Sequence, residues 1–350
     1  MPVQLSFIVP SRPGTDVSGI TAQIRRLDLS GRTAEVFFVG GTLPPLQRNV
    51  AIRRTTGDFV FLLDDDLILP SDLVPRTLAQ FDDDRVAVVG GPNTTPTDDP
   101  PFAQMSGIVL ASPLATGATS SRWRHAAADR DATERKLHGC FLCFRGDLLR
   151  QYLFVEDLFP NDENELMWRL RRDGYKLYYI PECSVEHRRR STLRSHLRQV
   201  YISGRGRGEL VRRSGVADQL LYLMPLGFVF YLFALPFAIR QPILAVPFLA
   251  YLVLALGLSI VSVLRVGHPV FLCTGAVMFA SHVAYAVGLL RGMSAAKKWT
   301  AGPLTIEVMA LGSAPAPDAV GQRPGDDVVT AGRQVVVEHV GVARAEQGVK

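Results

Sequence analysis

The feature that most constrains the fold is a wholly apolar run at residues 59–63, which ends in three consecutive carboxylates, Asp64, Asp65 and Asp66. A short apolar run of this kind is typical of a strand buried on both faces. Because a buried strand does not hold unpaired charges, the carboxylates are expected at its end. Crowded carboxylates repel one another, and Mg²⁺ or Mn²⁺ relieves that repulsion because both ions prefer oxygen ligands. The alternative is an acidic turn in which Asp66 caps the segment that follows.

The residues before this run alternate between strand and helix patterns. Apolar runs at 5–10 and 34–39 predict two further strands, and apolar residues recur at helical spacing over 20–27. A second helix is expected over residues 47–56. The resulting β-α-β-α-β order predicts an α/β fold with a mostly parallel, Rossmann-like sheet.

The loops that follow the three predicted strands are expected to meet. Ligands of parallel sheets bind beyond the carboxyl ends of the strands. Residues 10–12, 40–41 and 64–66 all lie at such ends. The sequence therefore predicts one binding site, of the size of a nucleotide, at this edge of the sheet.

Further motifs extend the pattern through residue 210. In chain order they are Ser6-Phe-Ile-Val-Pro-Ser-Arg12, Gln47-Arg48-Asn49, Thr56-Gly57-Asp58, the run ending at Asp66, Val88-Val-Gly-Gly-Pro92, Gly139-Cys-Phe-Leu-Cys-Phe-Arg145, Phe159-Pro-Asn-Asp-Glu-Asn-Glu-Leu166 and Val185-Glu-His187. Together they resemble the family 2 glycosyltransferases, inverting enzymes with a nucleotide-diphospho-sugar transferase fold of the glycosyltransferase A type. A later segment, from Arg198-Gln199 to Arg207, resembles membrane-bound members that build exopolysaccharides. The resemblance implies transfer of a hexosyl-type sugar from a nucleotide-diphosphate donor.

The resemblance also implies roles for individual residues. The metal would be held by Asp64, Asp66 and His187. A carboxylate at the start of a helix, Glu163 or Asp162, would serve as the general base. The donor would contact Pro10, Ser11, Arg12, Gly40, Arg48, Asp64 and Asp65. The acceptor or the diphosphate would contact Glu165, Arg198, Gln199, Arg205 and Arg207.

Two departures from the family pattern leave alternatives open. Gly40-Gly41 stands where the family has an Asp that reads the nucleobase. Asp162-Glu163 stands where the family has Glu followed by Asp, so the base could be at either position. A simpler explanation for these acids is that they favour a helix N-terminus through its dipole. A structural role is likewise the alternative for His187.

The four cysteines invite a zinc hypothesis, which we reject. Cys140, Cys143, Cys183 and His187 are zinc-ligand types at compatible spacings. Cys140 and Cys143, however, fall in a predicted strand, where residues three apart point to opposite faces. We therefore expect small buried thiols in a reducing compartment.

The C-terminal part of the chain predicts a membrane protein. The mean hydropathy of +0.15 is high for a soluble enzyme, and the excess comes from residues 220–239, 243–264 and 270–290, which are nearly uncharged and long enough for a bilayer. A buried helical bundle, or a re-entrant segment among the three, is the alternative. The arginine-dense segment before them, which supplies much of the net charge of +5, predicts that its side is cytoplasmic. No signal peptide is expected, and no nucleic-acid partner, because the arginines are not interleaved with aromatic residues.

These features predict four parts: a cytoplasmic catalytic domain at 1–187, a basic interfacial segment at 188–216, a transmembrane region of about three helices at 217–292, and a largely disordered tail at 293–350. Within the first part, residues 112–135 are rich in Ser, Thr, Ala and Arg, and we expect them to form a mobile loop over the site.

The sequence thus predicts a multi-pass protein of the inner (plasma) membrane that acts as a metal-dependent inverting glycosyltransferase. The acceptor would be a lipid-linked saccharide in envelope or exopolysaccharide synthesis, because the spans bring the site to the bilayer. One alternative is a polyprenyl-phosphate glycosyltransferase, in which a lipid phosphate is the nucleophile. Another is a catalytically silent membrane scaffold that retains the fold.

Overall fold

An eight-stranded sheet forms the core of the computed structural model, which describes residues 4–215, 217–295, 299–311 and 333–338. Its strand order is β11-β10-β2-β1-β3-β7-β5-β8. The bounds are β1 (Leu5–Ser11), β2 (Ala34–Gly40), β3 (Phe59–Leu63), β5 (Val86–Gly90), β7 (Phe141–Arg145), β8 (Lys176–Tyr179), β10 (Leu304–Leu311) and β11 (Arg333–Glu338). β2, β1 and β3 are parallel neighbours, as are β5 and β8, whereas β7 runs antiparallel between β3 and β5. The predicted α/β fold is confirmed, with two strands inside the sheet, β7 and β10, running against the others.

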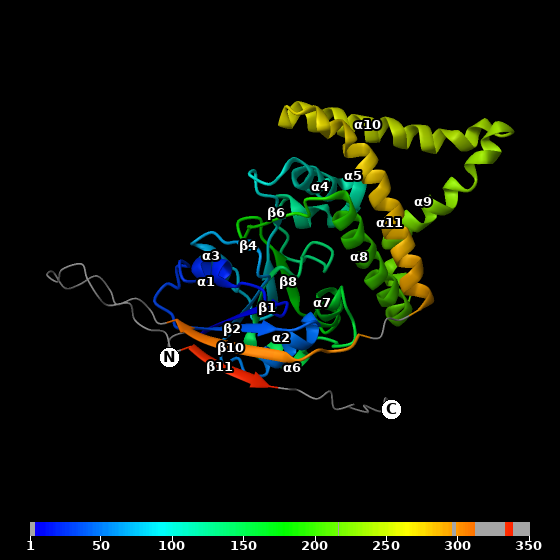
Figure 1. Cartoon of the computed structure of the whole chain (residues 1–350). Helices are drawn as coiled ribbons and strands as arrows, with labels where there is room; N and C mark the ends of the chain where they lie inside the picture. Colours follow the sequence, from blue (N-terminus) through cyan, green and yellow to red (C-terminus); the bar gives the residue numbers. More distant parts are fainter. Residues whose placement is uncertain (1–3, 216, 296–298, 312–332, 339–350) are drawn as a thin grey trace, which may run out of the picture.

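Helices cover both faces of this sheet (Figure 1). One face packs against α1 (Ser18–Ile24) and α3 (Leu73–Leu78), whose buried residues share a core with Phe7 and Phe61. The other face packs against helices that share a core with Ile8, namely α2 (Pro44–Ile52), α6 (Gly146–Tyr152) and α7 (Asp162–Arg172). Alternate residues of the strands enter the two cores because side chains of a strand alternate between faces.

The second predicted helix differs in its bounds. α2 begins at Pro44 and ends at Ile52, whereas the prediction was 47–56. Pro44 and Pro45 start the helix early because proline is favoured at the first helical positions, where its missing N–H costs no hydrogen bond. The order of elements through β3 agrees with the β-α-β-α-β prediction.

A second, three-stranded sheet lies at the carboxyl end of β3. It has the order β4 (Leu67–Ile68), β9 (Val185–His187), β6 (Asn93–Thr94). β4 follows the carboxylate run directly, and its Leu67 pairs with His187 of β9. This pairing brings a histidine from 120 residues further along the chain to the carboxylates.

The first of the three predicted membrane spans does not form one long helix. Residues 217–239 are divided among η2 (Ala217–Leu223), α9 (Met224–Leu232) and η3 (Leu235–Ile239). Two helices are long and apolar enough to cross a membrane: Pro242–Val266, made of η4 (Pro242–Ala245) and α10 (Val246–Val266), and Pro269–Ser294, made of η5 (Pro269–Cys273) and α11 (Thr274–Ser294). We predicted about three helices here, with a re-entrant segment as an alternative. Pro225 and Pro236 stand at the first turns of α9 and η3, where the first apolar segment is divided.

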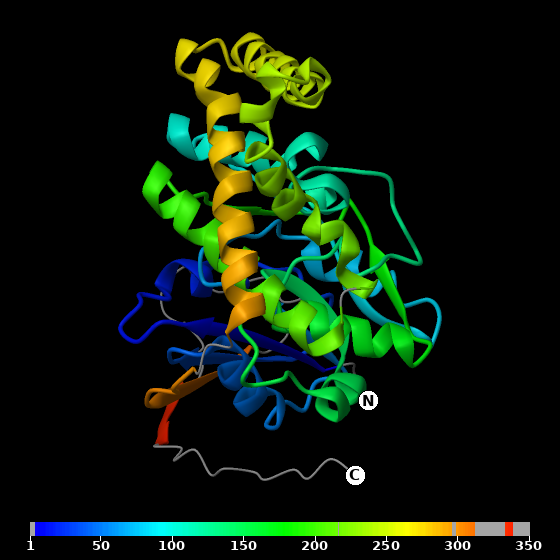
Figure 2. The ribbon, with the colours of Figure 1, turned by 90° about the vertical axis from the view of Figure 1, so that its right-hand side faces the viewer.

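Helix α11 packs along α8 (Leu193–Ser214), with the two helices running in the same direction (Figures 1 and 2). His196 of α8 lies 2.9 Å from the hydroxyl of Ser281 on α11. Further along, a β-carbon at Gly288 would overlap the carbonyl oxygen of Tyr201, and one at Gly208 would overlap that of Leu289. Close backbone approach through small residues is typical of tightly packed helix pairs.

Replacing Gly288 by Leu should destabilise this helix pair. The new side chain has no space against α8, so we expect a loss of about 1–3 kcal/mol of folding free energy and a lower melting temperature of the detergent-solubilised protein. Gly257→Leu on α10 is the matched control, because a β-carbon there has no neighbour within 4 Å. Equal melting temperatures for the two variants would contradict the packing described for α8 and α11.

After α11 the chain returns to the main sheet. β10 pairs antiparallel with the edge strand β2, from Thr305 opposite Gly40 to Leu311 opposite Ala34, and β11 pairs with β10. These two strands lie within residues 293–350, which we predicted to be a largely disordered tail, and β10 covers a sheet edge that β2 would otherwise leave open. The rest of the predicted tail, residues 312–332 and 339–350, lies outside the described residues.

Candidate active site

The three ligands predicted for a metal come together at the end of β3. Asp64, Asp66 and His187 each offer an atom within 4.8 Å of the others. The Nε2 atom of His187 lies 2.9 Å from Oδ1 of Asp66, and the imidazole is 12% exposed. Asp64 directly follows β3, and a turn at Asp65 and Asp66 brings the Asp66 carboxylate back toward that of Asp64. The strand pairing of β4 with β9 supplies the third ligand.

Burial makes these charges costly in the absence of a cation. Burial raises the pKa of Asp64 to about 6, although His187 and Arg48 oppose the shift. Burial alone would raise the pKa of Asp66 too, but His187 and Arg190 hold it below its ordinary value. The pKa of His187 is raised to about 10, since Asp66 and Cys140 outweigh the effect of burial.

The residues fit a divalent cation. Two carboxylates and an imidazole are a donor set that binds Mn²⁺ and, through its oxygens, Mg²⁺. In addition, Nδ1 of His187 is a buried polar atom without a hydrogen-bond partner in the part of the chain that the structure describes. Among the described residues, this is the one group of three or more such side chains that lie close enough to share a cation. Cys140, Cys143 and Cys183 are buried thiols.

An arginine links this group to the start of α7. The guanidinium of Arg48 donates to Oδ2 of Asp162 at 2.7 Å and lies 3.8 Å from Oδ1 of Asp64. Arg48 and Asp162 are 6% and 1% exposed, so the pair is buried. Burial raises the pKa of Asp162, and Arg48 beside it acts in the opposite direction. Arg48 was predicted to contact the nucleotide-sugar donor. In the structure it holds the carboxylates of Asp64 and Asp162 in place.

Of the two candidate bases, Glu163 is the more exposed and the less constrained by neighbouring charged groups. Its carboxylate lies over Gly139, where a β-carbon would be 3.0 Å from Cδ. It is half-buried and accepts one hydrogen bond, from Asn164 at 3.3 Å. In contrast to Asp162, Glu163 forms no ion pair with Arg48 in the part of the chain that the structure describes.

The loops predicted to contact the donor also lie together. Ser11 and Gly40 are register partners at the carboxyl ends of β1 and β2, next to Pro10. The Gln47 side chain donates to the Ser11 and Val39 carbonyls, which ties the two strand ends together. Arg12 is exposed and lowers the pKa of Asp65, which burial raises overall.

The described chain matches a family model directly. A model described as "Glycosyltransferase like family 2" covers residues 13–202, which is more than half of the sequence. The chain belongs to the glycosyltransferase-like family 2. The expected family and its glycosyltransferase A-type fold are thereby confirmed.

Two relatives agree with this assignment. A curated protein of Methanococcus voltae, dolichyl N-acetyl-alpha-D-glucosaminyl phosphate 3-beta-D-2,3-diacetamido-2,3-dideoxy-beta-D-glucuronosyltransferase, is 21% identical over 252 residues, 70% of this chain and 74% of that protein. Among solved structures, the mannosyltransferase PcManGT from Pyrobaculum calidifontis, in complex with GDP-Man and Mn²⁺, superposes with a TM-score of 0.52. That likeness has 19% sequence identity and covers 83% of this chain and 88% of that one, and it shows a shared fold.

The five residues predicted for the acceptor or diphosphate are not brought together in this glycosyltransferase. Arg198 and Gln199 are exposed near the start of α8. Glu165 and Arg207 line a cavity of about 160 Å³ between α7 and α8. Glu165 forms a two-point ion pair with Arg169 at 2.8 and 2.9 Å, which stabilises α7 itself. Arg205 is half-buried, and its carbonyl oxygen faces Gly292 of α11.

Sequence reasoning missed two side chains next to Glu163. Arg122 is 6% exposed and donates to Oδ1 of Asn164 at 2.6 Å and to the carbonyls of Glu134 and Arg135. His138 directly precedes Gly139, and burial together with nearby cations holds its pKa well below the ordinary value, so the imidazole is neutral. The one feature of the sequence that could have indicated His138 as a site residue is its position directly before the Gly139 motif.

Arg122 lies in the segment expected to be a mobile loop. Residues 113–123 of that segment are instead helical, as α5 (Pro113–Thr116) and η1 (Gly117–Trp123). This part of the predicted mobile loop thus has regular secondary structure, and Arg122 connects it to the start of α7.

Proposed function

We propose that this glycosyltransferase is a membrane-bound, metal-dependent inverting enzyme. It would transfer a sugar from a nucleotide-diphosphate donor to a lipid-linked saccharide, with its catalytic domain on the cytoplasmic side. The observation that carries the proposal is the position of Asp64, Asp66 and His187 beside the acidic start of α7, joined to it through Arg48. One end of this arrangement suits a diphosphate-bound cation, and the other supplies a carboxylate base.

The cation, Mg²⁺ or Mn²⁺, would be held by Asp64, Asp66 and His187 and would offset the charge that develops on the departing diphosphate. Support for a divalent ion comes from the Mn²⁺ in the structure of PcManGT and from the donor set of this chain. Arg48 keeps Asp64 and Asp162 in fixed positions, which removes the need to reorganise them during the reaction.

Glu163 is the residue we assign as general base. As the acceptor oxygen forms its bond to the anomeric carbon, the bond from that carbon to the diphosphate oxygen breaks, and the hydroxyl proton passes to Glu163. Asp162 is less suited to this role because Arg48 already holds its carboxylate at 2.7 Å. The Asp162 side chain is also only 1% exposed, so an acceptor hydroxyl has little access to it, although burial raises the pKa of this carboxylate.

The lipid-linked nature of the acceptor is supported by the connection between α8 and the apolar segments. Arg207 of α8 donates to Oδ1 of Asn161, the residue before Asp162, and its guanidinium lies 3.8 Å from the ring centroid of Tyr222. Tyr222 belongs to η2, which leads directly into α9. The start of the apolar region is thus in contact with the start of the catalytic helix. The name of the Methanococcus voltae relative, which contains a dolichyl-linked sugar phosphate, points to the same class of acceptor.

A donor and acceptor screen with membranes that contain the full-length protein tests this proposal. We expect release of nucleoside diphosphate from one of a panel of nucleotide sugars only when Mg²⁺ or Mn²⁺ and a polyprenyl-linked saccharide are both present. A chain with Asp64→Asn and Asp66→Asn serves as the inactive control. Release that depends on polyprenyl phosphate alone would favour the polyprenyl-phosphate glycosyltransferase instead. Absence of release with every donor would contradict the proposed activity.

A further inference from the structure

We infer that the apolar region crosses the bilayer as a two-arm hairpin, residues 220–266, with Arg240 and Gln241 at its tip on the far side. Helix α11 would then remain on the side of the catalytic domain as a docked helix. This inference rests on the proposed membrane location and replaces the three-span arrangement predicted from the sequence. The surface that the hairpin contacts is the phospholipid bilayer. The first arm is residues 220–239, and the second arm is residues 242–266.

Connectivity requires an even number of crossings. β1 through β8 precede the apolar region, and β10 follows it, yet β10 pairs with β2 in the same sheet. Both ends of the apolar region therefore lie on one side of the membrane. One or three crossings are excluded by this pairing.

Helix α11 is in contact with the catalytic domain over most of its length. Near its start, Phe271, Val277 and Met278 share a core with Met105 and Val109 of α4 (Pro101–Ala111). In the middle, Nε2 of His282 lies 2.9 Å from the carbonyl oxygen of Ala115, and the remainder packs on α8 as described.

The partner helix α8 cannot lie in hydrocarbon. It carries exposed arginines at positions 194, 198, 212 and 213, and each arginine placed at the centre of a bilayer costs about 3 kcal/mol or more. Since α11 runs beside α8 in the same direction, α11 is held outside the hydrocarbon with it. A pair of spans made of α10 and α11 is therefore excluded, although both pass a test of length and composition.

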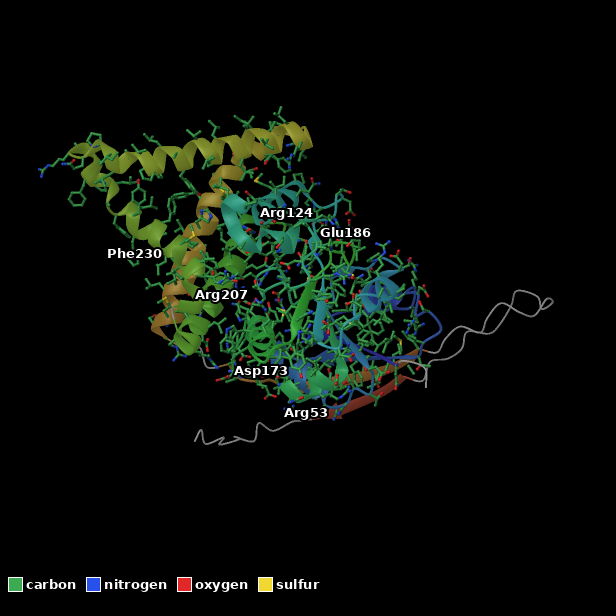
Figure 3. All side chains as sticks on the ribbon, turned by 180° about the vertical axis from the view of Figure 1, so that it is seen from behind. Arg53, Arg124, Asp173, Glu186, Arg207 and Phe230 are labelled. Carbon is green, nitrogen blue, oxygen red and sulfur yellow. The ribbon has the colours of Figure 1, made fainter. Side chains whose placement is uncertain are left out.

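The surface left for lipid is that of α9, η3 and α10. In the most apolar 18-residue stretch of Pro242–Val266, only 11% is buried, whereas 39% is buried in the corresponding stretch of Pro269–Ser294. Phe230, Phe233 and Ile239 of the first arm are 57%, 73% and 90% exposed. Figure 3 shows Phe230 pointing away from the catalytic domain, and Figure 1 shows α9 and α10 meeting at a corner clear of it. A soluble monomer does not expose apolar surface on this scale.

Length and charge place the tip across the membrane. Residues 220–239 and 243–264 contain no charged side chain. An α-helix of 20 residues extends about 30 Å, the thickness of the hydrocarbon core, and the second arm contains the 21-residue helix α10. The first arm has a similar number of residues, divided among η2, α9 and η3. The one charge between the arms is Arg240, which is exposed and would be costly inside hydrocarbon. A full crossing brings it to the opposite headgroups. The arginines of 188–213, together with Arg291, then stay on the catalytic side, as the positive-inside rule requires.

Cysteine labelling of the full-length protein tests the hairpin. Salt-washed, inside-out membrane vesicles are treated with a membrane-impermeant maleimide in a Cys273→Ser background, because Cys273 is exposed and the other three thiols are buried. The reporters are Asp84→Cys in the catalytic domain, His268→Cys between α10 and α11, and Gln241→Cys at the tip, with Arg240→Cys as a second tip reporter. We expect labelling of Asp84→Cys and His268→Cys in intact vesicles, and of both tip reporters only after detergent.

Three results would overturn the hairpin. Protection of His268→Cys with labelling of Gln241→Cys would make α10 and α11 the spans. Labelling of all reporters in intact vesicles would place the whole region on the catalytic side. Tip reporters that stay unlabelled from both membrane sides, but react in detergent, would leave the tip inside one leaflet. Sugar transfer is not measured here, so the hairpin and the proposed activity fail independently.

Discussion

Asp66→Ala is expected to abolish sugar transfer while leaving the fold intact. Asp66 is the most exposed of the three proposed metal ligands, with its side chain 45% exposed, and its Oδ1 lies 2.9 Å from His187. Removing one of two carboxylates from the site weakens cation binding and with it the charge stabilisation of the leaving diphosphate. Because such stabilisation amounts to several kcal/mol, turnover should fall by roughly 10³-fold or more. Turnover and Mn²⁺ binding, measured by calorimetric titration, are the two readouts.

Asp84→Ala is the matched control, because that side chain is fully exposed at the end of the sheet away from the group. It should retain both Mn²⁺ affinity and turnover. Asp66→Ala also removes the partner of the buried His187 imidazole, so we expect a modest fall in melting temperature, and circular dichroism checks that the fold is retained. An Asp66→Ala enzyme that turns over normally and still requires metal would show that other residues hold the ion.

The part of the site that depends on neighbours in sequence could be predicted from the sequence. Asp64 and Asp66 follow a strand that is recognisable from five apolar residues, and they are separated by one residue only, so the turn after the strand keeps them close. The acidic start of α7 was likewise visible, because Asp162, Glu163 and Glu165 precede a helical apolar pattern. Family motifs then supplied His187, whose position depends on the pairing of β4 with β9.

Long-range pairing was beyond the reach of sequence patterns. The ion pair between Arg48 and Asp162 joins residues 114 positions apart. The sequence around either residue gives no indication that the other is its partner. Arg122 is buried by backbone carbonyls of another segment, so a charged residue in a Ser- and Thr-rich stretch was assigned to a loop.

Hydropathy also has a physical limit, which the apolar helices illustrate. It measures how apolar a helix is, and it does not distinguish protein from lipid as the surroundings. Helix α10 and helix α11 therefore look alike in the sequence, although Met278 and Leu289 of α11 are fully buried against protein while Val253 and Leu264 of α10 are 69% and 78% exposed. The return of β10 to β2 decides between the possible topologies, and that contact spans some 270 residues.

Glu163→Gln is expected to leave donor binding unchanged and to lower turnover by roughly 10²–10⁴-fold, because the amide keeps the volume of the side chain and removes its basicity. Glu163 makes one hydrogen bond, to Asn164 at 3.3 Å, which a glutamine oxygen also accepts. The melting temperature should therefore stay the same. Glu182→Gln, at an exposed carboxylate elsewhere on the surface, is the control for loss of a negative charge.

Asp162→Asn should behave differently, and the contrast assigns the base. Loss of the Asp162 carboxylate leaves Arg48 buried without its partner at 2.7 Å, and breaking a buried pair in this way costs about 3–5 kcal/mol. Its melting temperature should fall together with its turnover, whereas Glu163→Gln loses turnover alone. A fully active Glu163→Gln beside a folded but inactive Asp162→Asn would reverse the two roles. If both variants stay active, proton removal by a carboxylate is not required, and a phosphate nucleophile becomes the better explanation of the site.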